Sequence, residues 1–262
     1  MSAANLIFLL VVMAGVGLFI YTTFLRDKWI RRRPFPAQWD AQLSARLAPY
    51  SALSIDEKSR LQQMIQLFLA KKRFYGCNGL EITDEIRVSI AAQACLLVLN
   101  QGWAVYPKLM SILVYPDAFR AERELQQEDG TIAAASHNML GESWSNGKVI
   151  LSWDDITRGA RDFTDGHNVV LHEFAHQLDG QSGATNGAPP LYRNSYQSWA
   201  RVFGENYSDL QARINRRLPR VMDDYGATNP AEFFAVATEA FFEKPGELKE
   251  HRPELYEELS KY

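Results

Sequence analysis

Segment 168–179 constrains this chain more than any other stretch, because it combines a helical pattern with a metal-binding spacing. It runs Asn-Val-Val-Leu-His-Glu-Phe-Ala-His-Gln-Leu-Asp, and its apolar residues recur at helical spacing. Residues four apart lie one above the other on a helix, so the imidazoles of His172 and His176 can meet one zinc ion at about 2.0 to 2.1 Å. Glu173 lies one step round the helix and points past that ion. We therefore predict a helix with two metal ligands and a general base, Glu173, for a metal-activated water.

The same spacing also fits an ordinary amphipathic helix with two solvated histidines and a glutamate. The chain has only five histidines in 262 residues, so a chance pair at this spacing is uncommon. Apolar residues fill both gaps of the motif, which disfavours exposure of that face to solvent. The metal-binding interpretation is therefore preferred, and the sequence has to supply a third ligand.

Segment 229–243 offers two candidates for that ligand. Asn229 is a good N-cap residue and Pro230 suits the first helical position, so a helix begins there. Glu232 and Glu239 lie two turns apart on one face of this helix, among phenylalanines. Glu232 can instead bond back to the N-cap amide, but a pair of inward-facing carboxylates needs a cation. Both stay open as ligands, with Glu232 preferred.

Two imidazoles and one carboxylate would leave the fourth position of a single zinc ion open for water, as catalytic sites require. Glu239 would then orient a ligand histidine through a hydrogen bond. Asp179, three residues after His176, is a second candidate for that orienting role. The alternative for Asp179 is a surface residue at the end of the helix.

The first 33 residues differ from the rest of the chain. Residues 6–25 are twenty residues without a charge, and in a helix this length reaches about 30 Å, enough to cross a bilayer. Five of the next eight residues are Arg or Lys. Basic residues after the apolar run favour a retained anchor over a cleaved signal peptide, although a buried core helix stays possible. We predict a single-pass transmembrane helix in a bacterial-type inner membrane, with the remaining chain facing the cytoplasm.

The rest of the chain has the size and composition of a folded domain. It is 47% hydrophobic over 262 residues, with a net charge of −3 and a pI near 6.0, which predicts no direct nucleic-acid binding. Cys77 and Cys95 lack a metal-type spacing and are interpreted as free thiols. We divide the chain into an anchor with its basic flank, 1–33, and a domain, 34–262. This domain has a helical part, about 34–105, and a catalytic part, about 106–262.

Local patterns predict an α+β fold that is mostly helical with a small mixed sheet. Ser54 and Glu57 have capping-box spacing before an apolar face that continues to residue 69, and Thr83 is a candidate N-cap for a helix over 84–99. A further helix is predicted over about 193–217, with four residues facing inward: Tyr196, Trp199, Phe203 and Leu210. Strands are predicted over 111–115, over a segment that ends at Trp144, and over 149–153, with a hairpin turn at Asn146-Gly147 between the last two.

Two expectations concern the substrate cleft. Segment 147–153 is either an exposed sheet edge that pairs with an extended substrate or an ordinary sheet strand. Loops over 120–146 and 180–190 are expected to shape the cleft.

Five blocks of the chain resemble the Mlc titration factor A family of zinc metallopeptidases. The similarity covers about residues 36–250, and the last two blocks are highly specific; the blocks are 79–83, 114–116, 143–144 with 149–153, 172–179 and 229–236. The resemblance implies a zincin-like core, peptidase activity on small aminopeptidase substrates, and a metal held by His172, His176 and Glu232. It also implies that Glu173 is the base and that Tyr225 stabilises the oxyanion. The alternative for Tyr225 is a turn residue that packs on the helix start.

Two functions follow as hypotheses. The first is a membrane-anchored zinc peptidase that acts on a peptide or protein substrate. The second is a binding protein that sequesters a transcriptional repressor of the Mlc type, with a structural or regulatory metal. Every expected catalytic position is occupied, which favours the first hypothesis.

Overall fold

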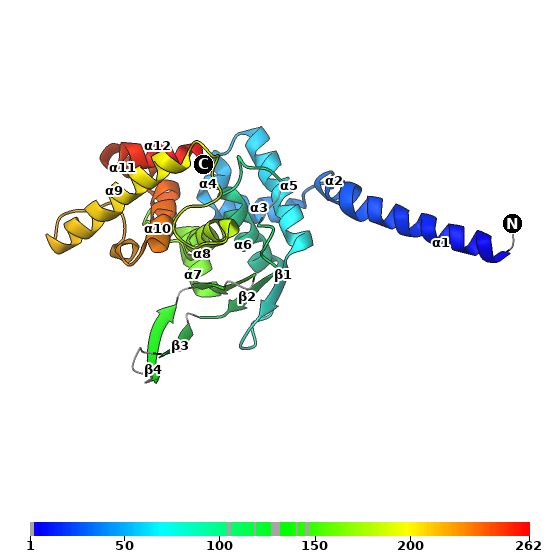
Figure 1. Cartoon of the computed structure of the whole chain (residues 1–262), viewed down its shortest axis with the longest axis horizontal. Coiled ribbons are helices and arrows are strands. Elements are labelled where there is room, and N and C mark those ends of the chain that lie inside the picture. Colours follow the sequence, from blue (N-terminus) through cyan, green and yellow to red (C-terminus); the bar gives the residue numbers. More distant parts are fainter. Residues whose placement is uncertain (1–2, 104–105, 118, 127–131, 140, 145–146) are drawn as a thin grey trace.

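The computed structural model describes residues 3–103, 106–117, 119–126, 132–139, 141–144 and 147–262. Helices from both halves of the chain surround a small sheet, and the N-terminal helix extends away from this body (Figure 1). The N-terminal half contains α1 (Ala3–Ile20), the π-helical segment η1 (Tyr21–Leu25), α2 (Arg26–Arg31), α3 (Ala37–Arg46), α4 (Ala48–Ala52), α5 (Ile55–Lys71) and α6 (Asp84–Leu96). The C-terminal half contains α7 (Trp153–Arg161), α8 (Val169–Asp179), the 3-10 turns η2 (Gly180–Ser182) and η3 (Asp224–Ala227), α9 (Tyr196–Asn215), α10 (Pro230–Glu243), α11 (Pro245–His251) and α12 (Pro253–Lys261). The predicted α+β class, mostly helical with a small sheet, is confirmed.

The main sheet has four described strands in the order β1 (Arg73–Gly76), β2 (Ser111–Tyr115), β6 (Lys148–Ser152) and β5 (Gly141–Trp144). The first three strands run parallel and β5 runs antiparallel to β6, so the sheet is mixed as predicted. The hydrogen-bonding edges of β6 are taken by β2 on one side and β5 on the other. The hypothesis that segment 147–153 is an exposed edge is therefore wrong, and β5 is the edge strand on that side of the described sheet.

A loop was expected over 120–146, but two strands form within the described parts of residues 119–139. β3 (Phe119–Gln126) and β4 (Ile132–Met139) pair antiparallel and project below the body in Figure 1. The predicted hairpin before β6 is only partly described. Its two strands pair from Trp144 opposite Lys148, and Gly147 has a φ of 72°, a left-handed conformation that favours glycine, whereas Asn146 lies outside the described residues.

Helix starts agree with the sequence more closely than helix ends. The capping box of Ser54 and Glu57 and the Thr83 cap are present as predicted. The helix predicted to reach residue 99 ends at Leu96, because the N–H groups of Val98 and Leu99 bond three residues back, which tightens the chain into turns. α9 covers 196–215 instead of 193–217, and the prediction that Tyr196 faces inward is wrong, since it is 43% exposed at the first turn.

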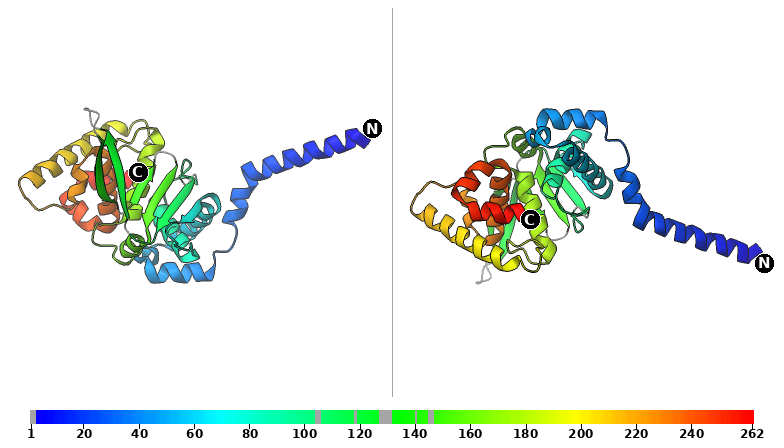
Figure 2. Two further views of the ribbon diagram at one scale, coloured as in Figure 1. Left: turned by 90° about the horizontal axis from the view of Figure 1, so that it is seen from below. Right: turned by 90° about the horizontal axis from the view of Figure 1, so that it is seen from above.

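α8 lies at the centre of the body. In both views of Figure 2 the strands and α8 lie between the N-terminal helices and the C-terminal helices, and α8 contacts α6, α7, α10, β5 and β6. Its buried face packs through Phe174, whose ring lies 4.8 Å from that of Tyr106 and 5.8 Å from that of Phe68. Burial of large aromatic side chains is among the strongest stabilising contributions in a core. The helix that carries the histidines is therefore held rigidly from several sides.

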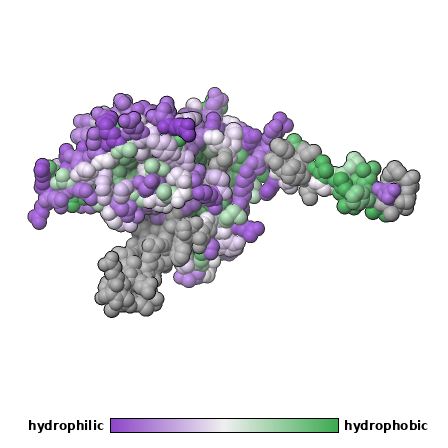
Figure 3. Space-filling model, viewed as in Figure 1, coloured by the Kyte–Doolittle hydropathy of each residue, from purple (hydrophilic) through white to green (hydrophobic). Residues whose placement is uncertain are grey.

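The N-terminal segment departs from its prediction. The continuous helix expected over 6–25 is divided at Ile20 between α1 and η1, and among the described residues no helix combines the length and hydropathy needed to cross a membrane. The predicted transmembrane helix is therefore not supported. Figure 3 shows hydrophobic residues along α1, outside the body. α2 packs on α5, where Arg26 donates to the carbonyl of Ala70 and Asp27 pairs with Lys71. The predicted location at an inner membrane stays a prediction.

Candidate metal site

Two capped helices position the candidate site. Asn168 begins α8, and its side-chain oxygen accepts hydrogen bonds from Val170 and Leu171, both at 3.1 Å. Asn229 begins α10 as predicted, with Pro230 in the first turn, and it accepts from the N–H of Glu232 at 3.0 Å. α8 and α10 pack against each other. The N-terminal turn of α10 thus faces the histidines of α8.

Three side chains from these helices converge on one point. Glu232 Oε2 lies 3.0 Å from His172 Nε2 and 3.1 Å from His176 Nε2, and the two Nε2 atoms are 3.2 Å apart. Among the described residues this is the only group of three or more side chains with metal-ligand atoms so close together. Donor atoms about 2.0 to 2.1 Å from a tetrahedral zinc ion are about 3.3 Å apart. The two imidazoles and the carboxylate therefore fit a zinc ion in donor type and in spacing.

The charges of the site depend on one another. Burial raises the pKa of Glu232, but hydrogen bonds with His172 and His176 outweigh burial and bring the pKa down to about 2. Burial lowers the pKa of His172, yet its bonds with Glu232 and Glu239 hold that pKa well above its usual value. A proton on His172 thus supplies positive charge that a metal ion can replace.

Glu239 holds His172 from the side opposite the convergence point. Its Oε1 accepts from His172 Nδ1 at 2.7 Å, and its Oε2 accepts from the backbone N–H of Asn168 at 2.6 Å. The carboxylate is only 5% exposed. Because an ionised carboxylate only accepts, Nδ1 keeps its proton, and the second proton of the charged ring lies on Nε2, where a metal ion would displace it.

Glu173 and Tyr225 lie close to the same imidazole. Glu173 is buried on α8, and its negative charge contributes to the raised pKa of His172. Tyr225 lies in η3, which packs against α10, and its ring centroid is 5.9 Å from that of His172. Tyr225 is 54% exposed, so it lies at the rim of the site. A buried carboxylate and an exposed phenol thus flank the ligand set.

Asp179 has a different surrounding from the one predicted. It is fully buried, so its interpretation as a surface residue at the helix end is wrong. Its oxygens accept from the N–H groups of Gly187 at 2.7 Å and Ala188 at 3.0 Å. Burial raises its pKa, although these backbone bonds and His176 act in the opposite direction. The hydrogen bonds found for Asp179 hold the loop after α8, and the predicted orienting role toward a histidine gains no bond from the described residues.

Comparison with known proteins shows the family of this chain. The model of the glucose-regulated metallo-peptidase M90 family matches residues 21–262. The chain belongs to this family. Mlc titration factor A of Yersinia pestis is 30% identical over 243 residues, which cover 90% of this chain and 88% of that protein. An uncharacterized protein of Synechocystis is 48% identical over 240 residues, with 90% and 87% covered. The resemblance predicted from sequence blocks is confirmed.

Membership in the M90 metallopeptidase family agrees with a metal at the converging side chains, without fixing which metal it is. The three atoms that converge come from residues 172, 176 and 232, all within the matched range. Their roles as ligands, and those of Glu173 and Tyr225 in catalysis, stay predictions.

Three buried polar residues behind the candidate metal site were given no role by the sequence analysis: Gln93, Asn168 and Glu243. Asn168 bonds to Glu239, as described above, and also to Gln93 and Glu243. Gln93 was detectable as a lone amide in an apolar helix, and Asn168 as a good N-cap before an apolar run. No local pattern joins them, because Gln93 and Asn168 are 75 positions apart.

Proposed function

We propose that this chain is a zinc-dependent peptidase that hydrolyses peptide bonds with an activated water. The observation that carries the proposal is the convergence of His172, His176 and Glu232 within hydrogen-bond distance of one another. A zinc ion held there would polarise the scissile carbonyl and lower the pKa of a water molecule. Metallopeptidase family membership supports the same reaction class.

Each remaining residue has one task in this reaction. Glu173 accepts the proton of the attacking water and passes it to the leaving amine, a role that suits a buried carboxylate next to the ligands. Tyr225 donates a hydrogen bond to the oxyanion of the tetrahedral intermediate, and its exposure at the rim lets it meet a substrate. Glu239 keeps the proton of His172 on Nδ1.

The substrate is proposed to be an extended peptide or protein segment. β5 is the edge strand of the described main sheet and contacts α8, which carries both histidines. A free strand edge can pair with a substrate main chain. The chain should therefore be assayed on two kinds of substrate: small aminopeptidase substrates, and longer peptides with a reporter for internal cleavage.

The deciding experiment replaces Glu173 with Gln. Glu173→Gln keeps the size of the side chain and removes the base, so we expect unchanged metal content and hydrolysis reduced by about 10²- to 10⁴-fold. Glu250→Gln on the exposed face of α11 is the matched control and should hydrolyse like the parent. Equal turnover in Glu173→Gln and the parent would exclude this mechanism.

A second candidate function rests on the name of the relatives. Mlc titration factor A of Yersinia is named for titrating Mlc, and we propose that this chain also binds a repressor of that type. Binding can be measured by size-exclusion chromatography of the purified chain with a candidate repressor. A complex that survives His172→Ala would show binding without an intact metal site, whereas its loss would tie the repressor to that site.

A further inference from the structure

A set of buried polar side chains lies behind the candidate metal site and joins α6, α8 and α10. Gln93 and Asn168 are 1% exposed, and Glu239 and Glu243 are 5% exposed. Buried polar groups cost stability unless their hydrogen bonds are satisfied. Apolar side chains would fill these positions without that requirement, so a polar set here needs a reason.

The amide of Asn168 has one allowed orientation. Its oxygen accepts from two N–H groups at the start of α8, so its NH₂ must point the other way. There it donates to two side chains, Gln93 Oε1 at 2.9 Å and Glu243 Oε1 at 3.1 Å, and makes a longer contact of 3.4 Å with the carbonyl of Gly159. α7 closes the remaining side, because a Cβ added to Gly159 would lie 3.1 Å from both the side-chain carbon and nitrogen of Asn168. The side chain is therefore fixed in position and in direction.

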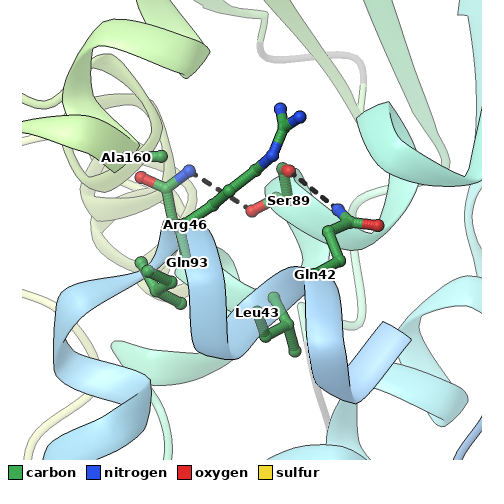
Figure 4. Close-up of a pocket in the computed structure, with 7 residues that line it drawn as sticks. Gln42, Leu43, Arg46, Ser89, Gln93 and Ala160 are labelled. Carbon is green, nitrogen blue, oxygen red and sulfur yellow. Dashed lines mark hydrogen bonds between the residues drawn. The ribbon is translucent and has the colours of Figure 1, made fainter. Parts of the chain in front are cut away.

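Its two acceptors are themselves held in place. Gln93 donates through Nε2 to the carbonyl of Ser89 at 3.2 Å, and since a carbonyl only accepts, the amide oxygen of Gln93 must face Asn168. Figure 4 shows this Gln93–Ser89 bond beside a small pocket between α3, α6 and α7. Glu243 accepts from the N–H of Gly166 at 2.9 Å through its other oxygen. Both acceptors for the Asn168 amide are thus set by the backbone.

The backbone of Asn168 continues this set to the metal ligand. Its N–H donates to Glu239 Oε2 at 2.6 Å, and Glu239 Oε1 accepts from His172 Nδ1 at 2.7 Å. One peptide N–H therefore sets the rotation of the carboxylate that orients His172. Any shift of Asn168 moves this donor, because side chain and backbone belong to the same residue.

We propose that Asn168 is a positioning residue of the candidate metal site, which fixes Glu239 against His172 and is itself fixed by Gln93 and Glu243. This inference rests on the proposed function only in assuming that His172 binds a metal. It assigns to Asn168 more than the capping of α8, because a cap needs only the side-chain oxygen. The NH₂ of the Asn168 side chain, which the cap does not use, fixes the residue against Gln93 and Glu243.

The two halves of the amide can be separated by Asn168→Asp. The carboxylate keeps the cap toward Val170 and Leu171, but it replaces the NH₂ by an oxygen that faces two acceptors. We expect the zinc affinity of the full chain to fall about tenfold, at the lower end of effects from residues behind metal ligands. It is measured by competition with a chromophoric chelator at a pH above the pKa of Glu243, which burial raises to about 8, so that this carboxylate is ionised. In the double variant with Glu243→Gln, the new amide can donate to the Asp carboxylate, so most of the lost zinc affinity should be recovered.

Ser54→Ala is the matched control, because it removes the N-cap of α5 far from the site. It should lower the unfolding midpoint and leave zinc affinity unchanged, which separates capping from positioning. If Asn168→Asp does not fold, Gln93→Leu removes one acceptor with an apolar side chain of similar size, and its expected loss of affinity is about threefold.

The outcomes distinguish the two proposals. Zinc affinity equal to the parent in a folded Asn168→Asp or Gln93→Leu variant overturns the positioning role and leaves the peptidase proposal intact. A loss that Glu243→Gln does not recover also counts against it. A parent chain that binds no zinc overturns both.

Discussion

The two ends of α8 hold their histidines in different ways. At the N-terminal end, His172 donates to Glu239 at 2.7 Å, and that carboxylate accepts from the backbone of Asn168. At the C-terminal end, the buried Nδ1 of His176 has no hydrogen-bond partner among the described residues. Asp179, three residues after it on the helix, accepts instead from the loop at Gly187 and Ala188. One helix thus combines an oriented ligand with one placed by packing.

This difference separates two tasks that a metal helix has to perform. A carboxylate on Nδ1 holds the proton there and raises the basicity of the other nitrogen, so Nε2 of His172 is the atom that exchanges its proton for a metal. His176 is aimed by the rigidity of α8, whose adjacent Phe174 and Ala175 are fully buried. At the C-terminal end of α8, the buried carboxylate of Asp179 holds the loop at Gly187 and Ala188, next to α10. Four predictions test this division.

The largest effect is expected at the oriented end. Glu239→Gln can accept from Asn168 through its oxygen, but its NH₂ then faces Nδ1 and favours the tautomer with a proton on Nε2, the atom required for the metal. We expect zinc affinity to fall by about 10- to 100-fold, measured by chelator competition. Affinity within error of the parent would show that His172 needs no orienting partner.

The pH dependence of zinc binding comes next. The raised pKa of His172 means that a proton occupies the ligand site of the metal-free chain at neutral pH. Zinc then has to displace that proton, so affinity should fall by about tenfold per pH unit below this pKa for one proton released. Titration calorimetry in buffers of different ionisation enthalpy counts the released protons. Binding without proton release between pH 6 and 7 contradicts the assignment.

At the other end, Asp179→Asn should change the loop and spare the metal. Its NH₂ would face one of the two backbone donors, so the bond to either Gly187 or Ala188 is lost, at a cost of about 1 to 3 kcal/mol in the free energy of unfolding. Denaturant unfolding gives that cost, and zinc affinity should match the parent. A loss of affinity as large as that of Glu239→Gln would remove the contrast between the two ends.

The last expected effect is on the pH dependence of stability, and it concerns Glu243. Burial, aided by Asp165 and Glu239, raises its pKa to about 8, against the bonds from Asn168 and Gly166. Its folded pKa exceeds its unfolded value, so its stabilising contribution is complete below about pH 4.5 and is lost as the pH rises to about 8. Glu243→Gln does not titrate, so its unfolding free energy relative to the parent should rise over this window, by a few kcal/mol after solvent screening. A constant difference from pH 5 to 8 would place the titration elsewhere.

Local patterns predicted the parts of the site that depend on one helix at a time. The spacing of His172 and His176, and the Asn229–Pro230 start that places Glu232, needed only helix geometry and capping rules. Glu239 was open as a ligand, and its contact with Nδ1 of His172 puts it on the far side of the imidazole from Glu232.

Long-range contacts explain the predictions that were wrong. β6 is interior because β2, more than thirty residues earlier, pairs along its other edge, and no local pattern shows such pairing. Asp179 is buried because the loop folds back on it, and Gly187 comes so close to Pro230 that an added Cβ would lie 2.4 Å from its carbonyl oxygen. The apolar run at the N-terminus predicted that a helix forms there but not where it ends, since the α-helix gives way to η1 at Tyr21.

The most direct test of the central claim is the metal stoichiometry of the full chain compared with Glu232→Ala. The account predicts one zinc ion per parent chain and an affinity lower by orders of magnitude in the variant, because α10 then supplies no ligand to the histidines of α8. Elemental analysis together with chelator competition gives both numbers. A parent without stoichiometric zinc, or a Glu232→Ala variant that binds zinc as tightly as the parent, would contradict the account.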